Sequence, residues 1–239
     1  IENGDPIQLV LVEDVLALSE VVVSATRQPV RKLQTTTAVS IINSELINQR
    51  RPEGISESIE GTPGMYTSQS QGRFRGAIFT RGFPDVSGNG LVYTGIMSDG
   101  LPTLATTARP PDFALGMDMN VERVEVVRGS AATLFGRASA AGVVNLINKT
   151  GGLKTKGAVR FTRYNENVDS REGLDFKIDA NVNGAFNKSW RYNVGGYYVN
   201  DRGFRDLGYD DRGGQFRFNI DKLIGENGTD GKIRIYGGY

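Results

Sequence analysis

The chain of 239 residues contains no cysteine and no histidine. The absence of cysteine excludes disulfide frameworks, thiolate metal sites and a cysteine nucleophile. The absence of histidine removes the commonest general base and the commonest zinc ligand, so most hydrolase and metalloenzyme mechanisms lack their usual parts. We therefore expect that the protein is not an enzyme, holds no metal and uses no cofactor.

The sequence also lacks an excess of one charge and a long apolar run. Its 28 Lys and Arg balance 27 Asp and Glu, so no global field favours a nucleic-acid partner. No apolar run reaches the roughly eighteen residues of a transmembrane helix, whereas a transmembrane β-strand needs only about ten alternating residues. The 31 glycines show no Gly-X-Y period, which excludes collagen. Glycine scattered beside Tyr, Phe and Asn is typical of a mainly β protein with many turns.

The most informative segment is 121–150, VERVEVVRGSAATLFGRASAAGVVNLINKT. An alternating strand over 121–127 breaks at Arg128 and Gly129, and a second apolar strand follows over 143–148. The spacing predicts a compact strand–turn–strand unit in which the glycines allow the backbone to bend or pack closely. Glu122 and Glu125 are three positions apart, so we expect them on opposite faces of the first strand.

This segment resembles the signature that ends the plug domain of TonB-dependent outer-membrane transporters, commonly written IERIEVLRGPxSxLYGxxAxGGVINIITK. Three further family motifs precede it in family order, namely TPGM at 62–65, IFTRGF at 78–83 and LVYTGIMSDGLP at 91–102. The departures are Thr80 before the motif arginine, the polar stretch 93–95 and Ser130 in place of the usual proline. The resemblance covers about half of the chain, and the stretch 93–95 leaves the strand register there open.

The resemblance implies a mainly β fold: a small α+β plug domain followed by the first strands of a truncated transmembrane antiparallel β-barrel. We expect a remnant of a preceding carboxypeptidase-regulatory-like domain at 1–14, of the kind found in Bacteroidetes-type transporters. The TonB box and linker then occupy 15–27, the plug domain 28–152, and about five incomplete barrel strands 153–239. Within the plug, the sequence predicts a strand over 39–43, a helix over 45–50 capped by Ser44 and stopped by Pro52, and a helical turn over 55–59.

The C-terminal segment predicts barrel strands by its alternation. Apolar residues fall on one face of 174–186 and polar residues on the other, and 158–164, 190–194, 215–221 and 232–236 alternate similarly. Aromatic residues near the strand ends are typical of membrane interfaces: Phe186, Trp190, Tyr192, Tyr197 and Tyr198. A soluble sandwich is the alternative. Because plugged barrels have about 22 strands, five strands cannot close, and we expect a larger protein.

The resemblance also implies a function and its partners. The protein would import a scarce nutrient across the outer membrane of a Gram-negative cell, with the plug inside the barrel and the N-terminus in the periplasm. The motif spacing is somewhat closer to transporters of a ferric siderophore or similar metal chelate; glycan or peptide import and a soluble β-rich adhesin are the alternatives. The partners would be TonB with ExbB and ExbD, outer-membrane lipid and a surface lipoprotein lid.

Three groups of residues are candidate sites. The TonB box would add to a TonB sheet as an extra strand; the alternative is that it forms the first strand of the next domain: Leu18, Ser19, Glu20, Val21, Val22, Val23 and Ser24. Arg81 and Arg128 match the paired plug arginines of the family and would face barrel carboxylates near Glu122 and Glu125, or else satisfy turn carbonyls. Two loops with Arg, aromatic and polar donors would contact an anionic ligand: Tyr66, Ser68, Gln69, Arg73, Phe74 and Arg109.

Overall fold

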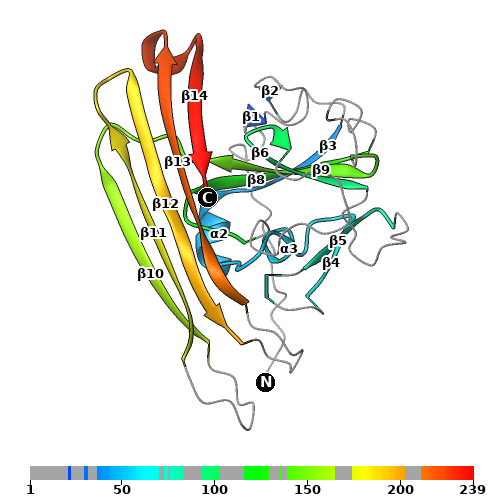
Figure 1. Cartoon of the computed structure of the whole chain (residues 1–239). Helices are drawn as coiled ribbons and strands as arrows, with labels where there is room; N and C mark the ends of the chain where they lie inside the picture. The colour runs from blue at the N-terminus through cyan, green and yellow to red at the C-terminus, as the bar shows by residue number, and fades with distance from the viewer. Residues whose placement is uncertain are drawn as a thin grey trace, which may run out of the picture.

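The computed structural model describes residues 21–22, 30–31, 37–69, 73–74, 76–82, 93–102, 116–129, 135, 139–164, 174–202 and 211–239. It has two parts. A tall, curved sheet, which we call the wall, stands beside a smaller α+β unit, which we call the plug, and the chain enters the wall after leaving the plug (Figure 1).

The plug contains a five-stranded sheet in the order β3-β8-β9-β6-β7. Its strands are β3 (Ala38–Ile42), β8 (Val121–Arg128), β9 (Gly142–Asn148), β6 (Thr94–Ser98) and β7 (Leu101–Pro102). Two small sheets join β4 (Met65–Ser68) to β5 (Ala77–Thr80) and β1 (Val21–Val22) to β2 (Val30–Arg31), and the helices are α2 (Ser44–Arg50) and α3 (Ile55–Ser58). The predicted strand–turn–strand unit is confirmed as the antiparallel pair β8–β9.

The first plug helix differs from its prediction by one residue. Asn43, and not Ser44, is the N-cap, because the Asn43 side chain accepts the Leu46 N–H at 3.0 Å while Ser44 is already helical. The helix ends at Arg50, before Pro52, and Arg51 adopts a left-handed conformation with φ 50°. The second helical turn, α3, is confirmed.

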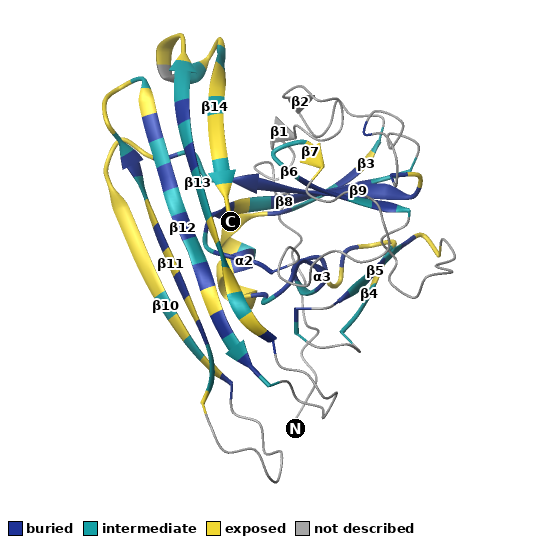
Figure 2. Cartoon of the chain, viewed as in Figure 1, coloured by how far each residue is buried: buried dark blue, intermediate teal, exposed yellow. Residues whose placement is uncertain are grey.

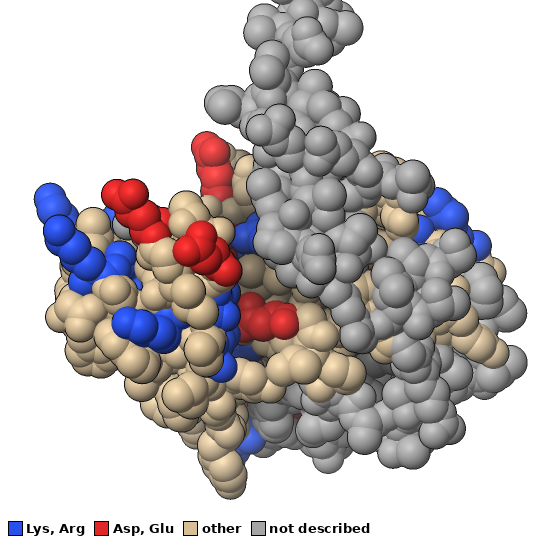
Figure 3. Space-filling model, turned by 90° about the horizontal axis from the view of Figure 1, so that it is seen from above, with Lys and Arg blue, Asp and Glu red and all other residues tan. Residues whose placement is uncertain are grey.

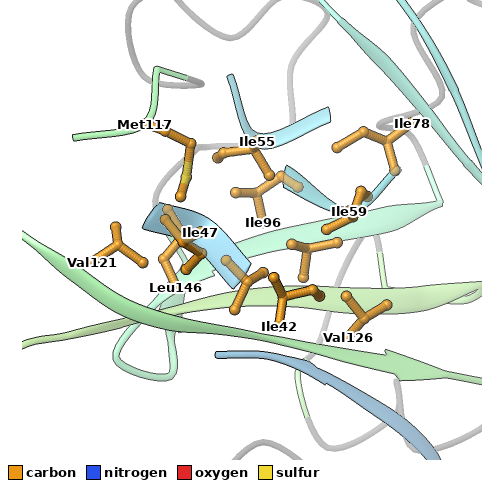
Figure 4. Close-up of a cluster of buried hydrophobic side chains, with 12 residues drawn as sticks. Ile42, Ile47, Ile55, Ile59, Ile78, Ile96, Met117, Val121, Val126 and Leu146 are labelled. Carbon is orange, nitrogen blue, oxygen red and sulfur yellow. The ribbon is translucent and has the colours of Figure 1, made fainter. Parts of the chain in front are cut away.

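The main core lies between the plug sheet and the two helices. Twelve apolar side chains from both sides of this layer pack together (Figure 4). On the sheet side they include Val124, Val126 and Val144, all 0 % exposed. All seven residues of β9 are buried, so this strand lies at the centre of the plug. The core explains why the β8–β9 segment is the most apolar part of the signature.

The parallel pairing of β6 with β9 was not predicted. Gly142 begins β9 where the neighbouring backbone is close: a Cβ there would lie 2.4 Å from the Val127 carbonyl oxygen. Gly142 therefore has a steric role, as expected for a motif glycine where two strands converge.

The wall is an antiparallel meander in the order β10-β11-β12-β13-β14. Its strands are β10 (Lys156–Tyr164), β11 (Asp175–Ala185), β12 (Trp190–Asp201), β13 (Asp211–Ile224) and β14 (Gly231–Gly238), with the short 3-10 helix η4 (Glu226–Gly228) between the last two. The five predicted strands are confirmed, although β12 and β13 run further than their alternating cores suggested.

The predicted alternation of the wall is also confirmed. On β11, Phe176, Ile178, Ala180 and Val182 lie on the outer face, whereas Lys177, Asp179 and Asn181 are buried on the face toward the plug (Figure 2). Large apolar side chains stay exposed on the outer face: Val159, Phe161, Ile178, Val182, Phe186, Tyr198, Phe216, Ile233 and Ile235. The expectation for Tyr197 was wrong, because this ring is 5 % exposed and faces the plug.

Within the described residues, no helix combines the length and the apolar composition needed to cross a membrane.

Candidate functional site: the contact between plug and wall

The inner face of the wall holds the plug through buried polar contacts. Lys177 of β11 is the most buried cation in this contact, with its side chain 2 % exposed. Its ammonium donates to Glu53 Oε2 at 2.8 Å and to the Met117 carbonyl oxygen at 2.7 Å. The Asp179 carboxylate lies 3.6 Å away on the same strand. Lys177 therefore joins two separate plug segments to one strand of the wall.

Aromatic rings complete the surroundings of Lys177. Its Nζ lies 4.7 Å from the centre of the Tyr197 ring and 5.7 Å from that of Phe74. The two rings are stacked at 6.4 Å, and Phe74 comes from the plug while Tyr197 comes from the wall. Gly116 permits this approach, because a Cβ at Gly116 would lie 2.0 Å from the Tyr197 hydroxyl. The cation is thus held by charge, by hydrogen bonds and by ring faces.

Further along the wall from this cation, asparagines from three neighbouring strands form a ladder that reaches into the plug. Asn181 donates to Asn120 Oδ1 and to Asn193 Oδ1, both at 2.8 Å. Asn193 donates in turn to Asn219 Oδ1 at 3.1 Å, and Asn219 donates to the Lys149 carbonyl oxygen at 3.2 Å. All four asparagine side chains are buried, and each has a partner, so the network avoids the cost of unpaired buried amides.

Two arginines of the wall make further ion pairs with plug carboxylates. Arg217 Nη2 lies 2.8 Å from Asp118 Oδ2, and the Asp118 side chain is 0 % exposed. Arg234 Nη1 lies 2.8 Å from Asp99 Oδ2, and its Nε lies 2.6 Å from Asp221 of the wall. Together with Lys177 and Glu53, these contacts share one polarity: the plug supplies the acid and the wall supplies the base.

One contact has the opposite polarity, and it involves Arg73 and Phe74 of the predicted ligand site. Arg73 of the plug lies 3.3 Å from Asp201 of the wall and 4.4 Å from the centre of the Tyr164 ring. Phe74 beside it is 0 % exposed and packs with Tyr164, Tyr197 and Val199. The Phe74 side chain is therefore closed to a ligand in this structure. The sequence around Arg73 and Phe74 suggests a solvated loop, but these two residues pack against the wall.

The other predicted ligand residues are spread along β4. Tyr66 is 67 % exposed and packs against Phe79 at 5.6 Å between ring centres. Ser68 and Gln69 follow at the end of the strand and are half-buried. Arg109 lies outside the described residues. The structure thus leaves Tyr66, Ser68 and Gln69 accessible.

Arg81 and Arg128 lie side by side, since a Cβ at Gly64 would lie 3.7 Å from Arg81 Cγ and 3.7 Å from Arg128 Cδ. Arg128 donates to the Pro63 carbonyl oxygen and, at 2.9 Å, to Ser40 Oγ. Burial and the positive charge of Arg81 lower the pKa of the Arg128 guanidinium. Arg128 Nε is buried without a hydrogen-bond partner in the described part of the chain.

Of the two glutamates expected near these arginines, Glu125 is 0 % exposed and pairs with Arg123 at 2.8 Å, while Glu122 is exposed. Strand β8 has a bulge between Val121 and Arg123, so alternation alone does not fix the face of Glu122. In the TonB-box segment, Val21 pairs with Arg31 and Val22 with Val30. Leu18, Ser19, Glu20, Val23 and Ser24 lie outside the described residues.

Glu57 of α3 supports the loop that carries Glu53. Its Oε2 accepts the Glu53 backbone N–H at 2.7 Å. Burial raises the pKa of Glu57 above its ordinary value of 4.5, and the hydrogen bond from Glu53 opposes the shift. The folded protein therefore holds this proton more tightly than the unfolded chain does. The contribution of Glu57 to stability falls as pH rises from 4.5 through the raised pKa.

We predict that Glu57→Gln stabilises the plug at neutral pH, because glutamine keeps the acceptor for Glu53 without a buried charge. The gain should disappear below pH 4.5, where the wild-type carboxyl is protonated. Urea unfolding of both proteins across this range measures the difference. A variant that is less stable at neutral pH would show that the charge of Glu57 is needed.

No group of three or more metal-ligating side chains occurs in the described ranges.

The sequence located the polar face of the wall but missed its plug partners, namely Glu53, Asp99, Asp118 and Asn120. In the sequence, each of these four is simply a polar residue next to an apolar plug segment. Such residues are common in loops, so the pattern did not single them out.

Residues 31–143 match the family model of the TonB-dependent Receptor Plug Domain. The chain is 32 % identical over 196 residues to the ferric enterobactin receptor of Pseudomonas aeruginosa, covering 76 % of this chain and 25 % of that protein. It is 29 % identical over 185 residues to the vitamin B12 transporter BtuB of Vibrio vulnificus, covering 74 % of this chain and 27 % of that protein. The chain thus spans about a quarter of the length of these relatives.

Among solved structures, the pyoverdine outer membrane receptor FpvA from Pseudomonas aeruginosa, bound to pyoverdine, matches with a TM-score of 0.70. The match covers 95 % of this chain and 31 % of that one at 19 % identity, and so shows a shared fold. It extends over both plug and wall, which the family model alone does not. This chain belongs to the TonB-dependent receptors: it carries their plug domain, followed by strands that resemble part of the receptor barrel.

Proposed function

We propose that the protein carrying this chain imports a ferric siderophore or a similar metal chelate across the outer membrane, driven by TonB with ExbB and ExbD. The main observation behind the proposal is that the plug packs on the polar inner face of the wall, while the outer face of the wall is apolar. This is the arrangement expected of a plug that fills a lipid-embedded barrel. The ferric enterobactin receptor among the relatives supports an iron chelate as cargo.

In this proposal the plug closes the path until a ligand binds at its exposed side. Tyr66, Ser68 and Gln69 are accessible there and would contribute to ligand contact. The adjacent guanidiniums of Arg81 and Arg128 repel each other, and Arg128 Nε lacks a partner among the described residues. A carboxylate from a strand outside this chain would neutralise both, which makes the pair a contact that can be broken when the plug rearranges.

The TonB box would act through backbone pairing. We predict that Val22→Pro abolishes energy-dependent uptake, because proline removes the N–H that a strand partner needs and disrupts extended pairing. Binding of the ferric chelate should be unchanged. The matched control is Val22→Thr, which keeps both the N–H and the β-branched side chain and should transport normally.

Uptake of radioactive iron supplied as catecholate or hydroxamate chelates tests this proposal in cells that express the complete protein, with and without TonB. Uptake that requires both TonB and an intact Val22 supports it. Saturable uptake of cobalamin but of no iron chelate would favour the vitamin B12 alternative, to which the 29 % identical relative points. Uptake that is independent of TonB would contradict the proposal.

A further inference from the structure

The outer face of the wall carries a cation, Lys222, for which the described part of the chain supplies no anionic partner. Trp190 of β12 and Lys222 of β13 stand opposite each other in register, and Lys222 Nζ lies 5.3 Å from the centre of the Trp190 ring. Within the described ranges, the Lys222 ammonium makes no hydrogen bond and no ion pair. An ammonium has three donors, so this group can take acceptors from outside the described part of the chain.

Apolar side chains surround this pair. Phe186, Ile224 and Ile233 are 66 %, 43 % and 59 % exposed. The Tyr192 ring packs against Phe186 with 4.9 Å between centres. Trp190 itself is 37 % exposed, so its indole is open to the same surroundings. A cation on an aromatic ring beside exposed apolar surface suits a molecule that has both an anionic head and an apolar tail.

At one end of the wall, cationic side chains outnumber anionic ones. The turns 186–189 and 225–230 and the entry to β10 form what we call the short-turn end, which faces the viewer in Figure 3. Its exposed or half-buried side chains comprise five lysines against two carboxylates: Lys154, Lys156, Lys188, Lys222 and Lys232 against Glu226 and Asp230. At the opposite end, Arg202 pairs with Asp175 at 2.8 Å, and Arg73 lies 3.3 Å from Asp201.

The connections of the wall indicate which leaflet this end meets. The other two connections, 165–174 and 202–210, are longer. Outer-membrane barrels place short turns in the periplasm and long loops outside, so the short-turn end lies at the inner leaflet. This assignment to the inner leaflet rests on the outer-membrane location given in the proposed function. It does not depend on which cargo the protein carries.

From these observations we infer that the short-turn end binds the phosphate of an anionic phospholipid. Lys222 holds the phosphate above the Trp190 ring. Lys188, exposed in the adjacent turn, adds to the attraction. The acyl chains lie on Phe186 and Ile233.

Native mass spectrometry of the complete detergent-purified protein tests this inference, with phosphatidylglycerol and zwitterionic phosphatidylcholine as probes. We expect the wild type to retain phosphatidylglycerol in preference, and Lys222→Gln to reduce this retention about fivefold, the effect of one surface lysine near an anionic headgroup. Lys222→Arg should keep it. The matched control, Arg163→Gln, removes an exposed cation from the same outer face near the opposite end of β10 and should change nothing.

Equal retention of the two lipids by the wild type would overturn the inference. So would equal losses in Lys222→Gln and Arg163→Gln, or a loss in Lys222→Arg as large as in Lys222→Gln, because the effect would then be structural and not electrostatic. Fractionation of the cells reports separately on the proposed function. A protein absent from the outer membrane would contradict the location, whereas lipid retention is measured on purified protein.

Discussion

Lys177→Met is expected to weaken the attachment of the plug to the wall by about 3–5 kcal/mol, because a buried ion pair that loses one partner leaves the other charge uncompensated. The Glu53 carboxylate would lose its donor at 2.8 Å, and the buried Asp179 would lose the neighbouring positive charge at 3.6 Å. The Met117 carbonyl oxygen would also lose its donor. Methionine keeps most of the side-chain volume, so the effect reports the charge and the hydrogen bonds.

Hydrogen exchange of the plug segments around Glu53 and Met117 measures this loss in the complete protein. Lys188→Met is the matched control, since Lys188 is exposed in a turn of the same wall and should cost little. The double variant Lys177→Met with Glu53→Gln should be less destabilised than the sum of the single variants, by roughly 1–3 kcal/mol. Additive effects would show that the two residues do not act as a pair.

Arg234→Met is the second substitution for which we expect a large loss of stability. Arg234 makes two hydrogen bonds to Asp221, at 2.6 and 2.7 Å, and an ion pair to Asp99 at 2.8 Å. Asp221 is 0 % exposed and would remain as a buried carboxylate whose charge is no longer paired. We expect a loss of about 3–5 kcal/mol in wall stability, together with release of the Asp99 turn of the plug.

Arg234→Lys distinguishes geometry from charge. Lysine keeps the charge but cannot form the two-point contact with Asp221, so an intermediate loss is expected. Asp99→Asn should cost less than Arg234→Met, because Asp99 is more exposed than Asp221. Denaturant midpoints of the purified variants rank the three changes. If Arg234→Lys behaved as wild type, the two-point contact would have no energetic role.

The sequence predicted the elements of this fold better than their contacts. The β8–β9 pair and all five wall strands followed from glycine placement and from alternation, which are local signals. Alternation also assigned Lys177, Asp179 and Asn181 to the polar face of β11. It could not say whether that face meets water or plug, since both environments suit polar side chains.

The contacts that the sequence did not predict share one physical origin. Phe74 and Arg73 have the composition of a solvated loop, but their partners Tyr197 and Asp201 come from a strand more than a hundred positions later in the chain. Tyr197 has an aromatic signal typical of a membrane interface, but its position on the strand points it inward. The register of β6 also depended on a parallel neighbour, β9, that no local pattern specifies. The plug boundaries and the remnant at 1–14 stay predictions.

The shared polarity of the three main ion pairs has a consequence for plug movement. Glu53, Asp118 and Asp99 of the plug each meet a cation of the wall, so separating the two parts would leave several buried charges unpaired at once. We therefore expect this side of the plug to stay on the wall while other parts of it rearrange.

The central claim is that the plug lies on the inner face of this wall, and cross-linking tests it most directly. Because this chain has no cysteine of its own, Asp118→Cys with Arg217→Cys would introduce a thiol pair where the two side chains are in contact. We predict rapid cross-linking in isolated outer membranes with a short thiol reagent. No cross-linking is expected for Asp118→Cys with Lys222→Cys, which lies on the outer face of the same strand. Cross-linking of the second pair, or of neither, would contradict the account.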